Sequence, residues 1–360
     1  MNVIIRTDAS VEIGTGHVMR CLTLANQFKK NNVNVSFVCR AFTGNLISLI
    51  KDQGFAIHVL PAMTDQYHWQ WIKENWAKDA QETQRFIHQM DSEVDLLIVD
   101  HYELNIKWEE AIRSSVKYIM VMDDLANRPH NCHILLDQNY YLDSEKRYEK
   151  LVPHSCMQLI GPNYALLREE FLILDPLKTD RDGTIKNILV FFGGTDPTGE
   201  TIKALKALHY LNKKDITVNV VLGSSNPRKE CIKEFCAKMT NVHYHSQINY
   251  MAKLMVQADL AIGAGGSTSW ERCYLGLPAI TIILADNQKE LTEAVTSFGA
   301  MYCLGESQNV TPAHIMDKIR ELCDHPREVM NMTRKCRELM NPDVLKEQLA
   351  VKKIMELCAK

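Results

Sequence analysis

The sequence predicts an α/β protein made of two doubly wound, Rossmann-like domains with parallel sheets. The chain has 360 residues, more than one compact core usually holds. Short apolar runs alternate with helical stretches, as they do in sheets that are covered by helices on both faces. The same alternation begins again after a polar segment near the middle of the chain, which indicates a second domain of the same class.

The first half contains six apolar runs of strand length. Runs of this length, separated by helical stretches, favour a parallel sheet. We expect strands at 3–5, 33–38, 56–60, 95–99, 118–122 and 134–136. A polar helical region over 67–90 lies between the third and fourth runs. It is either a flap that faces a ligand or a solvated helix.

The second half repeats the pattern and then becomes helical. We expect strands at 188–192, 217–222, 260–262 and 278–283, a helix near 250–255, and only helices from 311 onward. The polar segment between the halves contains Pro and Gly and is the best candidate for a linker. These features predict a first domain at 1–174, a linker at 175–186, a second domain at 187–340 and a final helix within 341–360. The final helix either packs back across the domain junction or makes contacts that the sequence does not define.

Composition excludes several classes of partner and cofactor. The formal net charge is −3 and no basic cluster is interleaved with aromatics, so we expect neither nucleic acid nor a membrane as a partner. No secretory signal and no apolar run of membrane-spanning length is visible, which predicts a cytoplasmic protein. The eleven scattered cysteines predict buried, reduced thiols rather than a zinc site. Asp180 and Asp182 form a DxD string in the charged linker, where a metal site is not expected.

The stretch Gly14-Thr15-Gly16-His17-Val18-Met19-Arg20 joins the first strand to the first helix and is the first candidate site. The glycines allow a tight turn that brings backbone amides close to a ligand. His17 falls in the first helical turn, where the helix dipole disfavours the imidazolium ion, and a neutral imidazole can act as a base. Met19 stands where a dinucleotide fingerprint would require Gly. The alternative is a glycine-rich turn with a helix-capping histidine.

Acidic residues follow three of the predicted strands. Asp8 follows the first strand, Asp100-His101-Tyr102 the fourth, and Asp123-Asp124 the fifth. Single Asp residues at strand ends are commonly helix caps. Because ligands collect at the carboxyl ends of parallel strands, three such groups at one edge favour a polar site over three separate caps. Asp8, or an acid near Asp100 or Asp123, is expected to orient the imidazole.

The second half contains a candidate phosphate-binding loop. Gly265-Gly266-Ser267-Thr268 follows a strand and opens a helix, so that amides point toward an anion and a hydroxyl caps the helix or binds phosphate. Glu271 lies one turn further and is placed to accept hydrogen bonds from both hydroxyls of a ribose. Gly193-Gly194-Thr195 follows another strand. The alternative is that the glycines serve only close packing, but two strand ends without side chains favour a bound nucleotide diphosphate.

These ordered motifs resemble the UDP-2,4-diacetamido-2,4,6-trideoxy-β-L-altropyranose hydrolases of pseudaminic acid biosynthesis. The resemblance extends over about residues 1 to 300, and a related branch associated with spore-coat polysaccharide synthesis shares the opening. Its motifs are IRTDAS at 5–10, IGTGHVMR at 13–20, DHY at 100–102, DDLA at 123–126 with Arg128, LDQNY at 136–140, GPNYALLR at 161–168, FGGTD at 192–196 and GGSTSWE at 265–271. It implies a GT-B-like fold in which two Rossmann-like domains face an interdomain cleft.

The resemblance also implies residue roles. His17 would be the catalytic base, and we expect Asp8 to assist it. The substrate-binding residues would be Gly14, Gly16, Arg20, Tyr102, Gly193, Gly194, Thr195, Gly265, Gly266, Ser267, Thr268, Glu271, Asn287 and Gln288. We further expect water to attack the anomeric carbon with inversion and to release UDP, with no metal and no cofactor, in a monomeric enzyme. A glycosyltransferase of the same fold and a nucleotide-sugar sensor without catalytic activity remain the alternatives.

Overall fold

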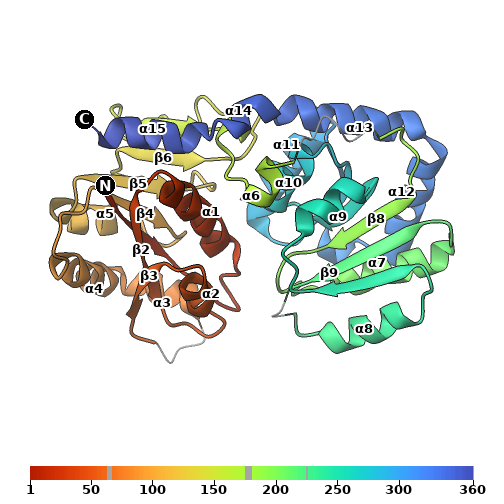
Figure 1. Cartoon of the computed structure of the whole chain (residues 1–360), viewed down its shortest axis with the longest axis horizontal. Coiled ribbons are helices and arrows are strands. Elements are labelled where there is room, and N and C mark those ends of the chain that lie inside the picture. Colours follow the sequence, from red (N-terminus) through yellow and green to blue (C-terminus); the bar gives the residue numbers. More distant parts are fainter. Residues whose placement is uncertain (63–66, 175–180, 224–225, 360) are drawn as a thin grey trace. The chain divides into compact units, whose positions relative to one another are not determined.

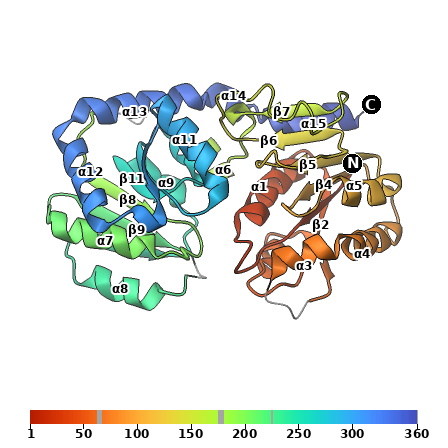
Figure 2. The ribbon, with the colours of Figure 1, turned by 180° about the vertical axis from the view of Figure 1, so that it is seen from behind.

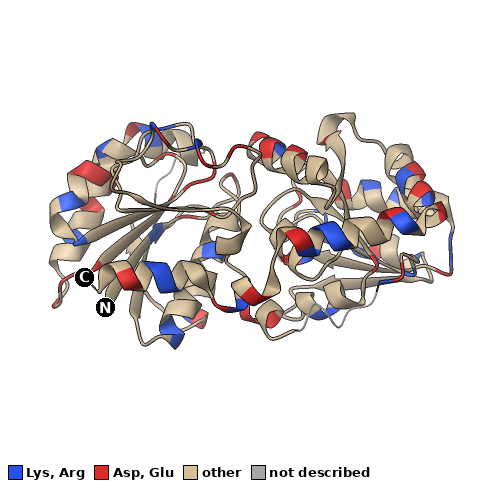
Figure 3. Ribbon diagram, turned by 90° about the horizontal axis from the view of Figure 1, so that it is seen from above, with Lys and Arg blue, Asp and Glu red and all other residues tan. Residues whose placement is uncertain are grey.

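The computed structural model describes residues 1–62, 67–174, 181–223 and 226–359 (Figure 1). The chain divides into two compact units. Unit 1 comprises Met1–Asn139, Asp143–Leu166 and Glu347–Lys360, and unit 2 comprises Tyr140–Leu142 and Leu167–Lys346. Each unit is built around one parallel sheet. Charged residues lie mainly on helices and loops, and the strands carry few of them (Figure 3).

Unit 1 contains a seven-stranded parallel sheet in the order β3-β2-β1-β4-β5-β6-β7. The strands are β1 (Asn2–Thr7), β2 (Asn34–Arg40), β3 (Ala56–Leu60), β4 (Leu96–Asp100), β5 (Tyr118–Met122), β6 (Ile134–Asp137) and β7 (Met157–Ile160). The helices are α1 (Gly16–Lys30), α2 (Ile47–Asp52), α3 (His68–Glu74), α4 (Trp76–His88), α5 (Ile106–Ile112) and α15 (Leu349–Cys358), with short 3₁₀ turns at Arg113–Ser115 and Pro162–Tyr164.

Side chains on each strand of unit 1 alternate between two apolar cores, one on each face of the sheet. Val3 and Ile5 pack in the core beneath α1 and α15, whereas Ile4 packs in the core with residues of α3, α4 and α5. On β4, Ile98 belongs to the first core and Val99 to the second. The face to which a strand residue points therefore decides which helices it can reach.

Unit 2 contains a six-stranded parallel sheet in the order β10-β9-β8-β11-β12-β13. The strands are β8 (Asn187–Phe191), β9 (Thr217–Leu222), β10 (Val242–Ser246), β11 (Leu260–Ala264), β12 (Ala279–Ile283) and β13 (Tyr302–Glu306). The helices are α6 (Glu169–Leu172), α7 (Glu200–Leu211), α8 (Lys229–Ala237), α9 (Met251–Gln257), α10 (Thr268–Tyr274), α11 (Lys289–Phe298), α12 (Pro312–Asp324), α13 (Pro326–Leu339) and α14 (Pro342–Lys346), with 3₁₀ turns at Asp286–Gln288 and Ser307–Asn309. Helices α7 and α12 pack side by side (Figure 2).

The predicted α/β class and every predicted strand are confirmed, but three strands were missed. The missed strands β7, β10 and β13 are three of the four edge strands of the two sheets. Each is only partly buried, and β10 has the mixed sequence Val-His-Tyr-His-Ser. An edge strand has one hydrogen-bonded neighbour and partial cover, so its sequence need not form an apolar run.

The boundaries between units differ from the expected ones. The N-terminal part of unit 1 ends at Leu166 rather than 174, and the chain returns to this unit at Glu347. Residues 175–180 of the expected linker lie outside the described residues. Arg181 is buried in unit 2, where it donates hydrogen bonds to the carbonyl oxygens of Ala258, Leu275 and Met255 at 2.9, 2.7 and 2.9 Å. This part of the segment is therefore integral to unit 2.

The final helix, α15, belongs to unit 1 and lies beside β6 (Figure 1). Its residues Ala350, Val351, Ile354 and Cys358 pack in the core beneath α1. The chain thus returns to the first unit after it completes the second. Among the described residues, no helix combines the length and the apolar character needed to cross a membrane.

Candidate active site

The first candidate site centres on His17, in the first turn of α1. Gly14 adopts a positive φ of 81°, which allows the turn that leads into this helix. The imidazole is 6% exposed, and its Nδ1 lies 2.6 Å from Oδ1 of Asp100. Asp100 is the last residue of β4, which pairs with β1, so the sheet places this carboxylate beneath the start of α1. The structure therefore brings together a histidine and an acid that are 83 residues apart.

The charge of Asp100 fixes the hydrogen on the imidazole. Burial alone would raise the pKa of this carboxyl group, but Arg20 and His17 outweigh burial and hold the pKa well below its ordinary value. An ionised carboxylate can only accept hydrogen bonds, so we assign the donated hydrogen to Nδ1 of His17. In the neutral imidazole, Nε2 then carries the lone pair. None of the described residues donates a hydrogen bond to it.

Arg20 holds Asp100 in place. Its Nε and Nη2 donate to the two oxygens of Asp100, both at 2.6 Å, and its Nη1 donates to Oδ2 of Asp124 at 2.8 Å. Such a two-point contact fixes the carboxylate in orientation as well as position. Arg20 was predicted to bind substrate, and the structure shows its guanidinium group in contact with two carboxylates of the protein.

Two aromatic rings lie against the imidazole. The Tyr102 ring meets it edge to face at 4.5 Å between centroids, and Trp69 stacks on Tyr102 at 5.5 Å. Trp69 also approaches His17, at 6.1 Å between centroids. Trp69 belongs to α3, in the region that the sequence left open as a flap or a solvated helix. The only feature of the sequence that could have pointed to Trp69 was the abundance of Trp in that region.

Asp8 does not orient the imidazole, contrary to the first of the expected assignments. It accepts a hydrogen bond from the backbone N–H of Arg40 at 2.7 Å and pairs with Arg6 at 2.8 Å. Asp8 follows Arg6 by two residues, and Arg6 points to the face of α4, where it binds Asp79. Asp100 is in register with Thr7, on the opposite face, which α1 covers. Strand alternation therefore directs Asp100 toward His17 and Asp8 away from it.

Asp123, the first acid after β5, also has partners other than His17. Asp123 accepts from Nη1 of Arg128 at 2.7 Å and from the backbone N–H of Ala126 at 2.9 Å. Burial lowers the pKa of the neighbouring His101 to about 3, because it disfavours the charged imidazolium ion. The Nε2 atom of His101 lies 3.7 Å from Oδ2 of Asp8. His101 is therefore neutral at physiological pH and belongs to the buried Arg6 and Asp8 cluster.

In unit 2, the glycines separate into two kinds. A Cβ added at Gly265 would lie 1.9 Å from Oγ1 of Thr292, and one at Gly223 would lie 2.3 Å from the carbonyl oxygen of Gly194. Gly265 and Gly223 therefore serve close packing. A Cβ at Gly193 would meet nothing within 4 Å, and one at Gly266 would meet only Nε2 of Gln288 at 3.8 Å. Gly193 and Gly266 thus leave backbone uncovered, as contact with a ligand requires.

The remaining predicted residues lie near these glycines. Thr195 is half-buried in the turn after β8. Ser267 is the N-cap residue of the seven-residue helix α10, which begins at Thr268, and the Ser267 side chain makes no capping hydrogen bond. Asn287 and Gln288 form the 3₁₀ turn before α11, and Oε1 of Gln288 accepts from the backbone N–H of Leu284 at 3.0 Å.

Glu271 lies in the first turn of α10 and is 13% exposed. Its Oε1 accepts a hydrogen bond from Nε of Arg168 at 2.7 Å, and Arg168 also pairs with Glu170 at 2.5 Å. The Arg168 contact holds one carboxylate oxygen of Glu271 in a fixed position. This ion pair within unit 2 was not anticipated from the sequence, although Arg168 closes one of the recognised motifs.

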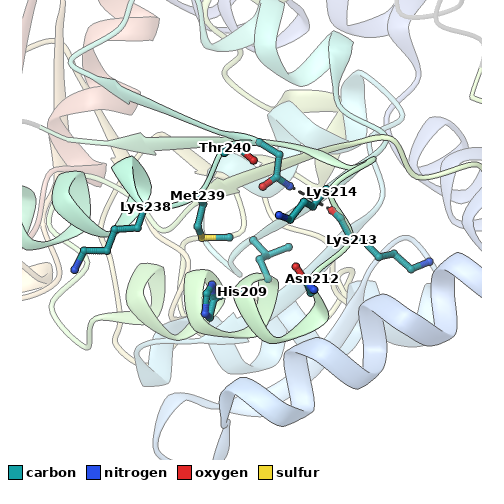
Figure 4. A pocket seen from close by; sticks show the side chains of 9 residues that line it. His209, Asn212, Lys213, Lys214, Lys238, Met239 and Thr240 are labelled. Atoms are coloured by element: carbon teal, nitrogen blue, oxygen red, sulfur yellow. Dashed lines mark hydrogen bonds between the residues drawn. The ribbon is translucent and has the colours of Figure 1, made fainter.

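A separate pocket of unit 2 lies among the ends of α7 and α8 and the start of β10 (Figure 4). It is lined by Leu208, His209, Asn212, Lys213, Lys214, Lys238, Met239, Thr240 and Asn241. These residues lie in helix-to-strand connections, at the amino edge of the sheet. Gly193 and Gly266 follow the carboxyl ends of β8 and β11, which is the edge where parallel sheets bind ligands. The pocket is therefore distinct from the candidate site.

Comparison with known proteins finds one matching domain family and several similar sequences. Residues 188–349 match the glycosyltransferase family 28 C-terminal domain. The UDP-2,4-diacetamido-2,4,6-trideoxy-beta-L-altropyranose hydrolase of Campylobacter jejuni is 29% identical over 80% of this chain and 94% of its own length. An uncharacterized protein of Methanocaldococcus jannaschii is also 29% identical, over 81% of this chain, and the match spans 57% of that longer relative.

The fold itself is found in solved structures. The crystal structure of Acinetobacter baumannii MurG matches with a TM-score of 0.67, at 17% identity, over 99% of each chain. The two parallel α/β units, with the family 28 domain in the second, correspond to the GT-B-like class that the motifs predicted. This chain therefore has a GT-B-like fold and is similar, over four fifths of its length, to a UDP-2,4-diacetamido-2,4,6-trideoxy-altropyranose hydrolase.

Proposed function

We propose that this protein hydrolyses UDP-2,4-diacetamido-2,4,6-trideoxy-β-L-altropyranose to UDP and the free sugar, a step in pseudaminic acid biosynthesis. The Campylobacter jejuni relative that carries this activity in its name matches over nearly its whole length. The observation that carries the chemical part of the proposal is the contact between His17 and Asp100, which leaves Nε2 of the imidazole as the proton acceptor.

In the proposed reaction, the oxygen of a water molecule attacks the anomeric carbon. The bond between that carbon and the UDP oxygen breaks, its electron pair leaves with UDP, and the configuration inverts. Nε2 of His17 accepts the proton of the water, while Asp100 stabilises the imidazolium ion that forms. Arg20 acts as a positioning residue through its two hydrogen bonds to Asp100.

In the same proposal, unit 2 supplies the contacts to UDP. The uncovered backbone at Gly193 and Gly266, with the hydroxyls of Ser267 and Thr268, would bind the diphosphate, and Glu271 would bind the ribose hydroxyls. Backbone amides can spread the charge that develops on the leaving phosphate. We assign the leaving-group chemistry to these protein groups and propose that no metal ion takes part.

The decisive experiment is hydrolysis in ¹⁸O-labelled water. We expect UDP to be released with water as the only acceptor, and mass spectrometry to find the label on the sugar. Label on UDP would mean attack at phosphorus and would contradict the proposed mechanism. The stereochemistry at the anomeric carbon, followed by NMR before mutarotation, tests the inversion.

A glycosyltransferase is the second candidate, and the match of residues 188–349 to a glycosyltransferase domain favours it. Such an enzyme would also bind a UDP-sugar but would transfer the sugar to an acceptor. The two functions are separated by the same assay, because a strict transferase releases little UDP until an acceptor is added. Rapid release of UDP in water alone would exclude a strict glycosyltransferase.

A matched pair of glycine variants tests the nucleotide site. Gly265→Ala should lower the free energy of unfolding by about 1–3 kcal/mol, because its Cβ would collide with the buried Thr292. Gly266→Ala has room for its Cβ, so its unfolding free energy should stay within about 0.5 kcal/mol of the wild type. If UDP contacts this backbone, Gly266→Ala should nevertheless weaken UDP binding about ten-fold, measured by calorimetry. Unchanged UDP affinity in Gly266→Ala would remove this loop from the site.

A further inference from the structure

An indole ring lies beside the candidate base without serving the apolar core. Trp69 is half-buried, whereas its neighbours His68, Trp71 and Ile72 are buried and anchor α3. Its ring stacks on Tyr102 with an interplanar angle of 18° and meets His101 edge to face at 5.0 Å. Together, Trp69 and Tyr102 form an aromatic wall next to the imidazole of His17.

Contacts made by the flanking residues His68 and Trp71 fix the position of Trp69. The backbone N–H of His68 donates to Oε2 of Glu12 at 2.7 Å, and the His68 ring stacks on Phe42 at 4.3 Å. Trp71 lies under the guanidinium group of Arg40 at 4.5 Å. Glu12 belongs to the same loop as Gly14, so α3 is tied to the turn that presents His17. The aromatic wall is therefore held in place relative to the base.

The chemistry of this wall defines what can lie against it. An aromatic face packs favourably on C–H groups and methyl groups, whereas a hydroxyl turned toward it loses its hydrogen bonds to water without replacement. A 2,4-diacetamido-2,4,6-trideoxy sugar carries acetamido groups at C2 and C4 and a methyl group at C6. An ordinary hexose carries hydroxyls at these positions. The wall thus suits the deoxygenated, acylated sugar.

We infer that Trp69, stacked on Tyr102, is a specificity-determining residue that selects UDP-sugars with methyl and acetamido groups in place of hydroxyls. This inference rests on the proposed function, because it places the sugar beside His17. It goes beyond that function by naming a side chain of α3 that distinguishes substrates and by assigning the helix to substrate recognition.

The test compares two donors, UDP-2,4-diacetamido-2,4,6-trideoxy-altrose and UDP-N-acetylglucosamine, in three variants. Trp69→Ala should lower kcat/KM for the trideoxy sugar by roughly ten-fold or more. The ratio of kcat/KM for the trideoxy donor to kcat/KM for UDP-N-acetylglucosamine should therefore fall. Trp69→Phe retains an aromatic ring and should keep most of the preference for the trideoxy donor. Tyr67→Ala is the matched control, since Tyr67 adjoins α3 but is 66% exposed. The inhibition constant of UDP should stay within about two-fold in all three variants.

An equal loss on both donors, or unchanged kcat/KM in Trp69→Ala, would overturn the inference. Failure of the proposed function gives a different result, namely that the wild-type protein hydrolyses neither donor. In that case, binding provides the readout. Wild-type protein should then bind the trideoxy donor more tightly than UDP by a margin that Trp69→Ala abolishes. If that margin is absent from the wild type or persists in the variant, the assignment of Trp69 is wrong.

Discussion

Replacing His17 with asparagine is expected to lower the rate of UDP release by a factor of about 10² to 10⁴ and to leave UDP affinity nearly unchanged. The asparagine side chain can still contact Asp100, but it has no basic nitrogen to accept the proton of the attacking water. The measurement is kcat for the UDP-sugar together with the dissociation constant of UDP. A loss of turnover without a loss of UDP binding would assign His17 to the chemical step.

The matched control is His58→Asn. His58 lies on the edge strand β3, where its ring stacks on Phe86 at 4.3 Å and has no contact with the candidate site. Its replacement should leave kcat within about two-fold of the wild type. Near-normal turnover in His17→Asn would remove this residue from the role of base, whatever the control shows.

Replacing Asp100 with asparagine should also lower kcat by a factor of about 10² to 10⁴. The carboxylate only accepts hydrogen bonds, and it therefore keeps the hydrogen on Nδ1 of His17. An amide can donate to Nδ1, which favours the tautomer that has hydrogen on Nε2 and no lone pair there for the water. The measurement is kcat at a temperature where circular dichroism shows the variant to be folded, because Arg20 loses a buried partner.

Asp124→Asn separates catalysis from stability in this experiment. Asp124 accepts a hydrogen bond from Arg20 but does not contact the imidazole, so its replacement disturbs the same guanidinium group. We expect kcat to fall by less than about ten-fold in this variant. If Asp124→Asn reduced kcat as strongly as Asp100→Asn, the effect would belong to Arg20 and the tautomer argument would fail.

Much of the architecture could be predicted from single elements of the sequence. The apolar runs at β1, β2, β4 and β5 are long enough and apolar enough to identify strands, because the centre of a parallel sheet is buried on both faces. The glycine-rich turn and His17 at the start of α1 were likewise predicted from local sequence. The edge strand β10 was not, because partial burial permits its two histidines.

The partners of the site residues could not be predicted in the same way. The sequence offered Asp8, Asp100 and Asp123 as acids at strand ends, and Asp8 was the one expected to assist His17. Their different roles depend on which face of the sheet each side chain takes and on the pairing of β4 with β1. The role of Arg20 similarly depends on two carboxylates that lie 80 and 104 residues further along the chain.

The sequence by itself determined the two α/β units, the central strands and the histidine at the start of α1, because burial and turn geometry are written in local patterns of residues. Only the tertiary structure decided that Asp100 rather than Asp8 contacts this histidine, that Trp69 lies beside it, and that Gly266 is uncovered whereas Gly265 is packed. The physical reason is that such contacts depend on strand order and helix placement, which join residues far apart in the chain.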